Sequence, residues 1–215
     1  MAIFDVRATV RGGASSGSPV LLDANEKREL LIAQGMPPYA EMTRKGEGWS
    51  VQTATLFAPL VAIPTTAAAL EIYNNHSTAS LIVDTLFASQ VMATAVVQTF
   101  AIYACVSTRK AAPTNTALDL FSSNGRAKIT TTASGEVITG IGTTVVANGW
   151  RPWGPPQAWA LAAATPGNSW HVPIDGRLIV PPGAALLLHV MGSLATASSF
   201  QVGASWYKET VTNVT

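Results

Sequence analysis

The sequence contains few charged side chains. Asp, Glu, Lys and Arg make up 12% of its 215 residues, about half of the roughly 25% found in average soluble proteins. Thirteen basic and twelve acidic residues give a formal net charge of +1 at pH 7, which provides no general attraction to nucleic acid or to an anionic membrane. Because 48% of the residues are hydrophobic, the chain also lacks the composition of a disordered protein. These absences leave a globular chain with an unusually neutral surface.

Cysteine and long apolar segments are scarce as well. The single cysteine, Cys105, excludes an internal disulfide framework. It lies between Ala104 and Val106, so we expect a small buried core residue rather than a nucleophile or a metal ligand. No run of about 18 consecutive apolar residues occurs, so we expect no membrane-spanning helix. The first residues lack a basic segment followed by an apolar one, so we expect no secretion signal.

No pattern of catalytic or metal-binding residues stands out. His76, His171 and His189 lie far apart in the sequence, without the spacing of a metal site. The segment Gly13–Gly17 matches the G-x-S-x-G nucleophile pattern, but it lies in a Gly/Ser-rich linker instead of between a strand and a helix. The acidic residues after position 50 are scattered singly, without the pairing that glycoside hydrolysis needs. We therefore predict a protein without enzymatic activity, cofactor or metal ion, in which His189 has a structural role.

The charges that are present are concentrated near the N-terminus. Residues 1–50 carry 12 of the 25 charged side chains, and the composition changes near Gly46–Trp49. We predict that residues 1–48 form an extended N-terminal arm with a short helix over Glu26–Gln34. Residues 49–215 form the second predicted domain. Its neutral surface favours burial against partner subunits, which predicts an oligomer or a component of a larger assembly.

The second domain has the pattern of an all-β protein. β-branched and aromatic residues recur in short runs separated by Gly, Pro, Asn and Ser, which is typical of β-sandwiches and barrels. The sequence predicts strands over Leu70–Tyr73, Ser80–Ala88, Val96–Ser107, Ala117–Phe121, Ala127–Ala133, Glu136–Ala147, Trp170–Ile174, Leu178–Val180, Ala185–Val190 and Ser199–Tyr207. Two segments, Ala67–Leu70 and Gln157–Ala164, could instead hold a helical turn or two.

The segment from Asp175 to Val190 gives the most specific indication of the fold. Strand-like residues Leu178–Val180 run into Pro181-Pro182-Gly183, a turn with glycine where a positive φ is needed. A second apolar strand follows, and a Gly/Ser loop then leads to an aromatic strand ending at Tyr207. This succession is typical of the end of a jelly roll. We therefore predict an all-β, jelly-roll-like β-sandwich for residues 49–215.

Residues 150–159 contain a dense cluster of tryptophan, proline and arginine. Such a cluster could form a platform that stacks on sugar rings, or a rigid loop that packs on a neighbouring subunit. We favour the subunit contact, because tryptophan and arginine are enriched in interface hot spots. The predicted interface residues are Pro37, Pro38, Tyr39, Arg44, Trp49, Trp150, Arg151, Trp153 and Trp159.

Three features together resemble structural proteins of tailed bacteriophage virions. They are the N-terminal segment containing AQGMPPYAEMTR, the Thr/Ala-rich β domain, and the ending that runs from LIVPPGAALLLHV to SFQVGASWY. The chain looks most like a jelly-roll capsid decoration (cement) protein. The resemblance implies a non-enzymatic homotrimer on the virion surface, assembled in the host cytoplasm, whose arm contacts the major capsid protein or other virion proteins. The alternative is a receptor- or glycan-binding module of the phage head or tail.

Overall fold

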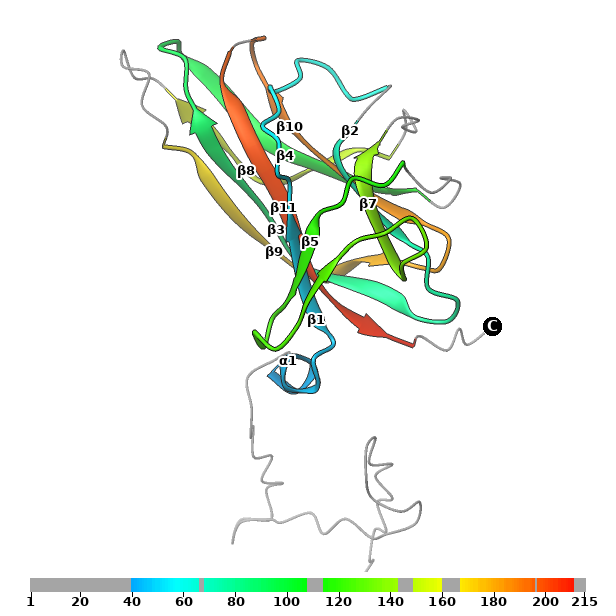
Figure 1. Cartoon of the computed structure of the whole chain (residues 1–215). Helices are drawn as coiled ribbons and strands as arrows, with labels where there is room; N and C mark the ends of the chain where they lie inside the picture. The colour runs from blue at the N-terminus through cyan, green and yellow to red at the C-terminus, as the bar shows by residue number, and fades with distance from the viewer. Residues whose placement is uncertain are drawn as a thin grey trace, which may run out of the picture. The chain divides into compact units, whose positions relative to one another are not determined.

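The computed structural model describes residues 40–65, 68–107, 114–142, 149–159, 167–195 and 197–210 (Figure 1). These residues form one short helix, α1 (Ala40–Lys45), and eleven strands. The strands are β1 (Gly48–Gln52), β2 (Ala68–Asn74), β3 (Ser80–Met92), β4 (Gln98–Ser107), β5 (Asp119–Ser122), β6 (Lys128–Thr130), β7 (Val137–Gly142), β8 (Arg151–Trp159), β9 (Ser169–Val180), β10 (Ala185–Gly192) and β11 (Ser199–Glu209). They build two antiparallel sheets packed face to face, so the predicted all-β sandwich is confirmed.

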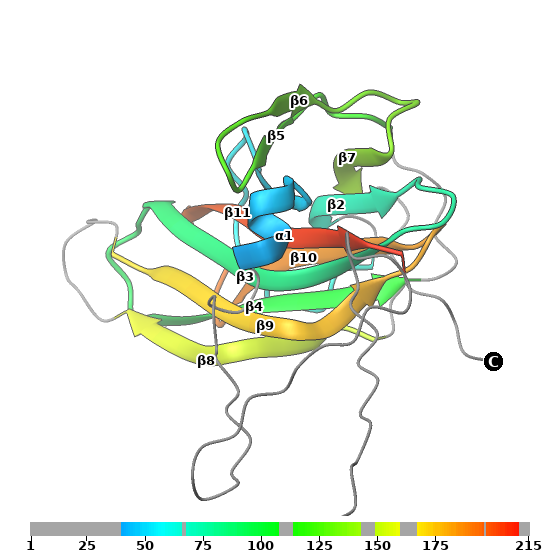
Figure 2. The same ribbon diagram turned by 90° about the horizontal axis from the view of Figure 1, so that it is seen from below.

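The order of the strands is that of a jelly roll. Neighbouring strands follow the order β1-β11-β3-β9 in one sheet and β2-β10-β4-β8 in the other. Successive strands alternate between the sheets, except where β4 leads to β8, which gives the two Greek keys of this architecture. The excursion between β4 and β8 adds β5 and β6 to the first sheet beside β1, and β7 to the second beside β2. Figure 2 shows this excursion along one side of the sandwich, with β8 and β9 along the other.

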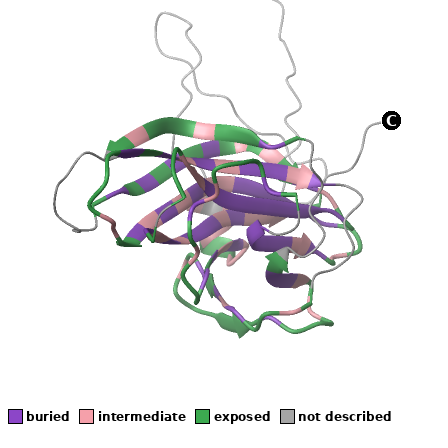
Figure 3. Ribbon diagram, turned by 90° about the horizontal axis from the view of Figure 1, so that it is seen from above, coloured by how far each residue is buried: buried purple, intermediate pink, exposed green. Residues whose placement is uncertain are grey.

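The core lies between the sheets and follows the alternation of side chains along each strand (Figure 3). In β9, Trp170, Val172 and Ile174 are buried, whereas the residues between them are exposed. Phe100 of β4 and Phe200 of β11 meet edge to face, with ring centroids 4.7 Å apart, and both contact Trp170. An aromatic pair of this kind stabilises by about 0.5–1.5 kcal/mol beyond the area it buries.

Strand β10 is buried on both faces. Leu186 and Leu188 belong to the core between the sheets, whereas Leu187 packs with Cys105 and Trp150 on the other face. A strand covered on both sides needs a continuous apolar run, and the sequence of β10 supplies it. Cys105 is 3% exposed, so its predicted place as a core residue is confirmed.

The turn predicted at Pro181-Pro182-Gly183 connects β9 to β10. Gly183 has a φ of 75°, and the N–H of Ala184 donates to the carbonyl of Pro181 at 3.1 Å. A positive φ at the third position is the geometry of a type II turn, where glycine is favoured and proline suits the second position. The prediction of this turn is confirmed.

Residues 150–159 were interpreted above as a rigid loop, but residues 151–159 form strand β8. It pairs along β4 from Gln98↔Trp159 to Ala104↔Arg151. Its three prolines are tolerated because β8 lies at the edge of its sheet, where one side of the strand needs no hydrogen-bonded neighbour.

The helical turns predicted over Ala67–Leu70 and Gln157–Ala164 were wrong where the structure describes them, since residues 68–70 begin β2 and residues 157–159 end β8.

The two strands predicted over Trp170–Ile174 and Leu178–Val180 form one strand, β9, with a bulge between them. Asp175 and Gly176 have φ values of 52° and 75°, and the register with β3 shifts at this point. Arg177 spans the bulge and donates hydrogen bonds to two carbonyl groups of β9 at 2.9 and 3.0 Å. Two consecutive residues with positive φ interrupt the extended backbone, which explains why the sequence predicted two separate strands here.

Helix α1 was not predicted. It lies within the predicted arm, residues 1–48, and ends at Lys45, just before Gly46, whose φ is 81°. The N–H groups of Gly46 and Glu47 donate to the carbonyls of Thr43 and Met42, both at 3.0 Å, which is the Schellman pattern of a helix end. With six residues, this helix, the one helix in the described part of the chain, is too short to cross a membrane. The helix predicted over Glu26–Gln34 lies outside the described residues.

Candidate interaction surfaces

Strand β8 does not present the exposed aromatic platform that sugar stacking requires. Trp150, just before the strand, is 7% exposed. Trp153 is half-buried against the core, and Arg177 covers it with its guanidinium carbon 5.9 Å from the ring centroid. A cation at this distance is attracted to the indole face and occupies the place of a ligand. Arg151 is exposed, and of Trp159 only the backbone is described.

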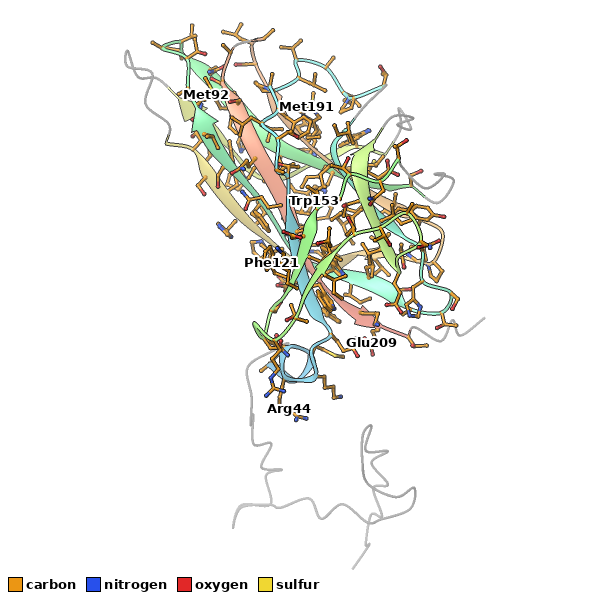
Figure 4. The ribbon with its side chains drawn as sticks, viewed as in Figure 1. Arg44, Met92, Phe121, Trp153, Met191 and Glu209 are labelled. Atoms are coloured by element: carbon orange, nitrogen blue, oxygen red, sulfur yellow. The ribbon has the colours of Figure 1, made fainter. Side chains whose placement is uncertain are left out.

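The remaining predicted interface residues are dispersed. Pro37, Pro38 and Tyr39 lie outside the described residues. Arg44 is exposed on α1, far from Trp153 in Figure 4, and Trp49 of β1 is half-buried against the core. The described members of the predicted set therefore do not share one surface.

A pocket of about 270 Å³ lies between the β5–β7 excursion and the sandwich. We call it the edge pocket. Two tryptophans, Trp49 and Trp206, line it together with aliphatic side chains of the core, and Thr130–Thr132 line it from the excursion. Sequence reasoning missed the edge pocket, because its walls come from segments that meet only through the β1–β5 and β1–β11 strand pairs.

Charged side chains of both signs lie beside the edge pocket. The Nζ atom of Lys208 is 3.2 Å from Oε2 of Glu136 and 3.8 Å from Oε2 of Glu47. The Nε2 atom of His76 is 3.6 Å from Oε1 of Glu136. The carboxylate of Glu136 is largely exposed, so the ion pairs of Lys208 are screened by water and contribute little stability. Their value lies in placing hydrogen-bonding groups next to an apolar hollow.

Cys105 and His189 are buried, in surroundings typical of structural residues. Burial raises the pKa of the Cys105 thiol to about 12, so the reactive thiolate is absent near neutral pH. Burial lowers the pKa of His189, an effect opposed by a hydrogen bond between its Nδ1 and the carbonyl of Val190 at 2.9 Å. The ring also packs edge-on against Phe57 at 6.5 Å, which supports the structural role predicted for His189.

Exposed apolar side chains gather at one end of the sandwich. Of the twelve exposed large hydrophobic residues in the described part of the chain, eight belong to the β1–β2, β3–β4 and β10–β11 connections or the strand ends next to them. We call this set the loop-end patch. It consists of Leu56, Val61, Ile63, Val91, Met92, Val96, Val97 and Leu194. Figure 1 shows these three connections together at the top of the molecule.

Backbone hydrogen bonds hold the loops of this end in place. The N–H of Leu60 donates to Val190, and the carbonyl of Leu60 accepts from Gly192, at 3.1 and 2.8 Å. Phe57 and Phe200 exchange a pair of hydrogen bonds at 2.9 and 2.8 Å. The β3–β4 connection is tied to the β10–β11 connection through the hydroxyl of Ser198, which accepts from the N–H of Thr94 and from the side chain of Gln98. The patch therefore stands on ordered backbone.

Charge is distributed unevenly along the long axis of the sandwich. The described residues of the loop end, 53–65, 89–99, 191–195 and 197–199, contain no Asp, Glu, Lys or Arg. Figure 4 shows Met92 and Met191 at this end and Arg44 and Glu209 at the opposite one. Lys208, Glu136 and Glu47 lie near that opposite end as well, since Lys208 adjoins Glu209 and is paired with both carboxylates. Charged side chains are thus absent from the loop end and present at the opposite end of the sandwich.

Two surfaces emerge from the described residues: the edge pocket with polar groups beside it, and the loop-end patch without charge. Within the described ranges, no three His, Cys, Asp or Glu side chains are grouped so that they could hold a metal ion. No protein-family model, curated protein or solved structure matches this chain.

Proposed function

We propose that the protein is a non-enzymatic structural component of a tailed-phage virion, a homo-oligomeric decoration protein that binds and stabilises the capsid shell. The observation that supports this proposal best is the charge-free loop-end patch on an ordered jelly roll. Exposed apolar surface costs about 25 cal/mol per Å² relative to its burial. A protein that works inside an assembly buries such a surface permanently.

The proposed role also uses the low charge of the rest of the domain. Many copies can lie side by side on a shell without strong like-charge repulsion when each carries little net charge. Modest contacts add up in such an array, because each bound copy and each bound segment raises the effective concentration of the next. The N-terminal residues, predicted to form an extended arm, would supply the second point of attachment to the major capsid protein.

The test is to locate the protein on particles and then remove its N-terminal segment. Purified virions of the phage that encodes it are labelled with an antibody against residues 40–210 and imaged. A variant lacking residues 1–39 is then added to particles that lack the protein. We place the cut before Ala40, because the carbonyls of Glu47 and Gly48 accept hydrogen bonds from the sandwich. Regular labelling of heads and loss of binding by the truncated chain are expected. Absence of the protein from purified virions would overturn the proposal.

A second candidate function, a receptor- or glycan-binding module of the phage head or tail, is favoured by the edge pocket. The pocket combines apolar side chains with threonine and charged groups, which suits the apolar and polar sides of a sugar ring, with Trp49 half-buried in its wall and Trp206 buried beneath it. We therefore assign this candidate function to the edge pocket instead of the Trp150–Trp159 segment. A glycan array separates the two candidates: a hit that is lost in the variant Ile129→Asp, which introduces a charge at the exposed rim, supports the module.

A further inference from the structure

We propose that the loop-end patch is the surface through which copies of this chain bind one another. The inference rests on the homo-oligomeric assembly proposed above and adds to it the face through which copies meet. Association at this end leaves the edge pocket and the charged opposite end free for other contacts. It also defines how two copies are oriented relative to each other, since only one end of each copy is free of charge.

The loop-end patch exposes large apolar side chains, and the backbone that carries them is ordered. Val97 is 69% exposed, Val61 58% and Met92 54%, so their apolar atoms are available to a partner without unfolding. The hydrogen bonds that join the β1–β2 connection to Val190 and Gly192 fix its loops before binding. A surface fixed in advance loses little conformational entropy on association, which leaves more of the burial free energy for affinity.

The charge pattern favours a second copy as the partner. A charged group buried against this surface would find no counter-ion in residues 53–65, 89–99 or 191–199, and an unpaired buried charge is strongly unfavourable. A complementary partner must therefore be free of charge where it touches the patch. The same end of another copy meets this condition, and closed symmetric contacts between identical surfaces are the commonest form of oligomer.

A lipid surface is a poorer match. Loops that insert into membranes combine apolar tips with Trp or Tyr at the interface and Lys or Arg for the headgroups. None of these four residue types occurs in residues 53–65, 89–99 and 191–199. The patch offers apolar contact area alone, which suits the dry interior of a protein–protein contact.

The experiment measures the oligomeric state of the full chain by sedimentation velocity over a range of concentrations. The test variant combines Met92→Asp and Val97→Asp, two substitutions at exposed positions that bring charge into the patch. The matched control is Ile179→Asp, which places the same charge at a 44% exposed position of β9 outside the patch. Circular dichroism checks that all three chains are folded. We expect wild type and Ile179→Asp to form the same oligomer, and the double variant to dissociate with a dissociation constant at least about tenfold higher.

A second measurement does not depend on destabilising the oligomer. In Val97→Cys, the introduced thiol is exposed whereas Cys105 is buried, so mild oxidation should cross-link copies only if position 97 lies at the contact. Three results would overturn the inference: a double variant that associates like wild type, a wild type that stays monomeric at all concentrations, or binding of the wild type to neutral phosphatidylcholine vesicles that the double variant loses. If the double variant still labels heads as an oligomer, the proposed function stands and only the assigned face is wrong.

Discussion

Asn74 provides the sharpest test of how the sandwich is held together at its charged end. Its side chain is fully buried, and its Nδ2 donates to the carbonyls of Ala79 at 2.8 Å and Val180 at 2.9 Å. Its Oδ1 accepts from the N–H of His76 at 3.0 Å. One side chain thus joins the end of β2, the β2–β3 turn and the end of β9, which are up to 106 residues apart in the sequence.

Replacing Asn74 with alanine removes three hydrogen bonds and leaves two buried carbonyl groups without these partners. Each such bond contributes about 1 kcal/mol net, and an unsatisfied buried group costs about 1–3 kcal/mol, so we expect a loss of about 3–4 kcal/mol. Since a domain of this size shifts by about 2–4 °C per kcal/mol, the melting temperature falls by about 10 °C. The neighbouring variant Asn75→Ala is the matched control: its Nδ2 makes one exposed hydrogen bond, to Gly135 at 3.0 Å, so its cost stays below about 1 kcal/mol.

Urea unfolding followed by tryptophan fluorescence measures both variants, and Asn74→Asp separates hydrogen bonding from shape. Aspartate keeps the size of the side chain but turns an acceptor oxygen toward the carbonyls of Ala79 and Val180. It should therefore destabilise at neutral pH at least as much as alanine does. The reasoning is refuted if Asn74→Ala and Asn75→Ala lie within about 0.5 kcal/mol of each other, or if Asn74→Asp is as stable as wild type.

Three further predictions concern buried positions in the two sheets. A Cβ at Gly203 would overlap the ring of Phe87 and the carbonyl of Val51, so Gly203→Ala should cost about 1–3 kcal/mol in urea unfolding, and adding Phe87→Leu should recover part of that loss. Cys105, buried and with a pKa of about 12, should resist a thiol reagent at pH 8 in the native protein and react at once in urea; rapid native reaction would contradict its burial. The pKa of His189 is lowered in the folded state by burial, so below its unfolded pKa of about 6.5 the unfolded chain binds more protons and stability falls as the pH drops. In His189→Gln this part of the pH dependence should be absent.

The strands were largely predictable because their signals are local. In β9, the alternation of Trp170, Val172 and Ile174 with exposed residues is visible in the sequence, and Gly183 after two prolines marks the turn into β10. The order of the strands was not predictable, since it depends on pairs such as Ala185↔Ser107, whose residues are separated by a long stretch of chain. Helix α1 and strand β1 were missed because each is too short to establish a period.

The candidate surfaces were predictable only in part. Low charge after residue 48 predicts an assembly, but it does not indicate which surface would be buried in it. The loop-end patch exists because the jelly roll brings Leu56, Val97 and Leu194 to one end, although they come from three separate segments. The tryptophans of residues 150–159 are adjacent in sequence, yet pairing with β4 buries Trp150 and places Trp153 beneath Arg177, which the sequence pattern could not indicate.

The excursion between β4 and β8 has a consequence for how the protein behaves when crowded. Without it, β1 and β2 would each leave a row of unpaired backbone groups at the same side of the sandwich, open to strand addition by another chain. With it, the outermost strands there are β6, three exposed residues long, and the short β7. The far side ends in β8 with three prolines and β9 with its bulge, neither of which offers a flat, complete ladder. Strand addition between neighbouring copies is therefore disfavoured at both sides of the sandwich, even at high protein concentration.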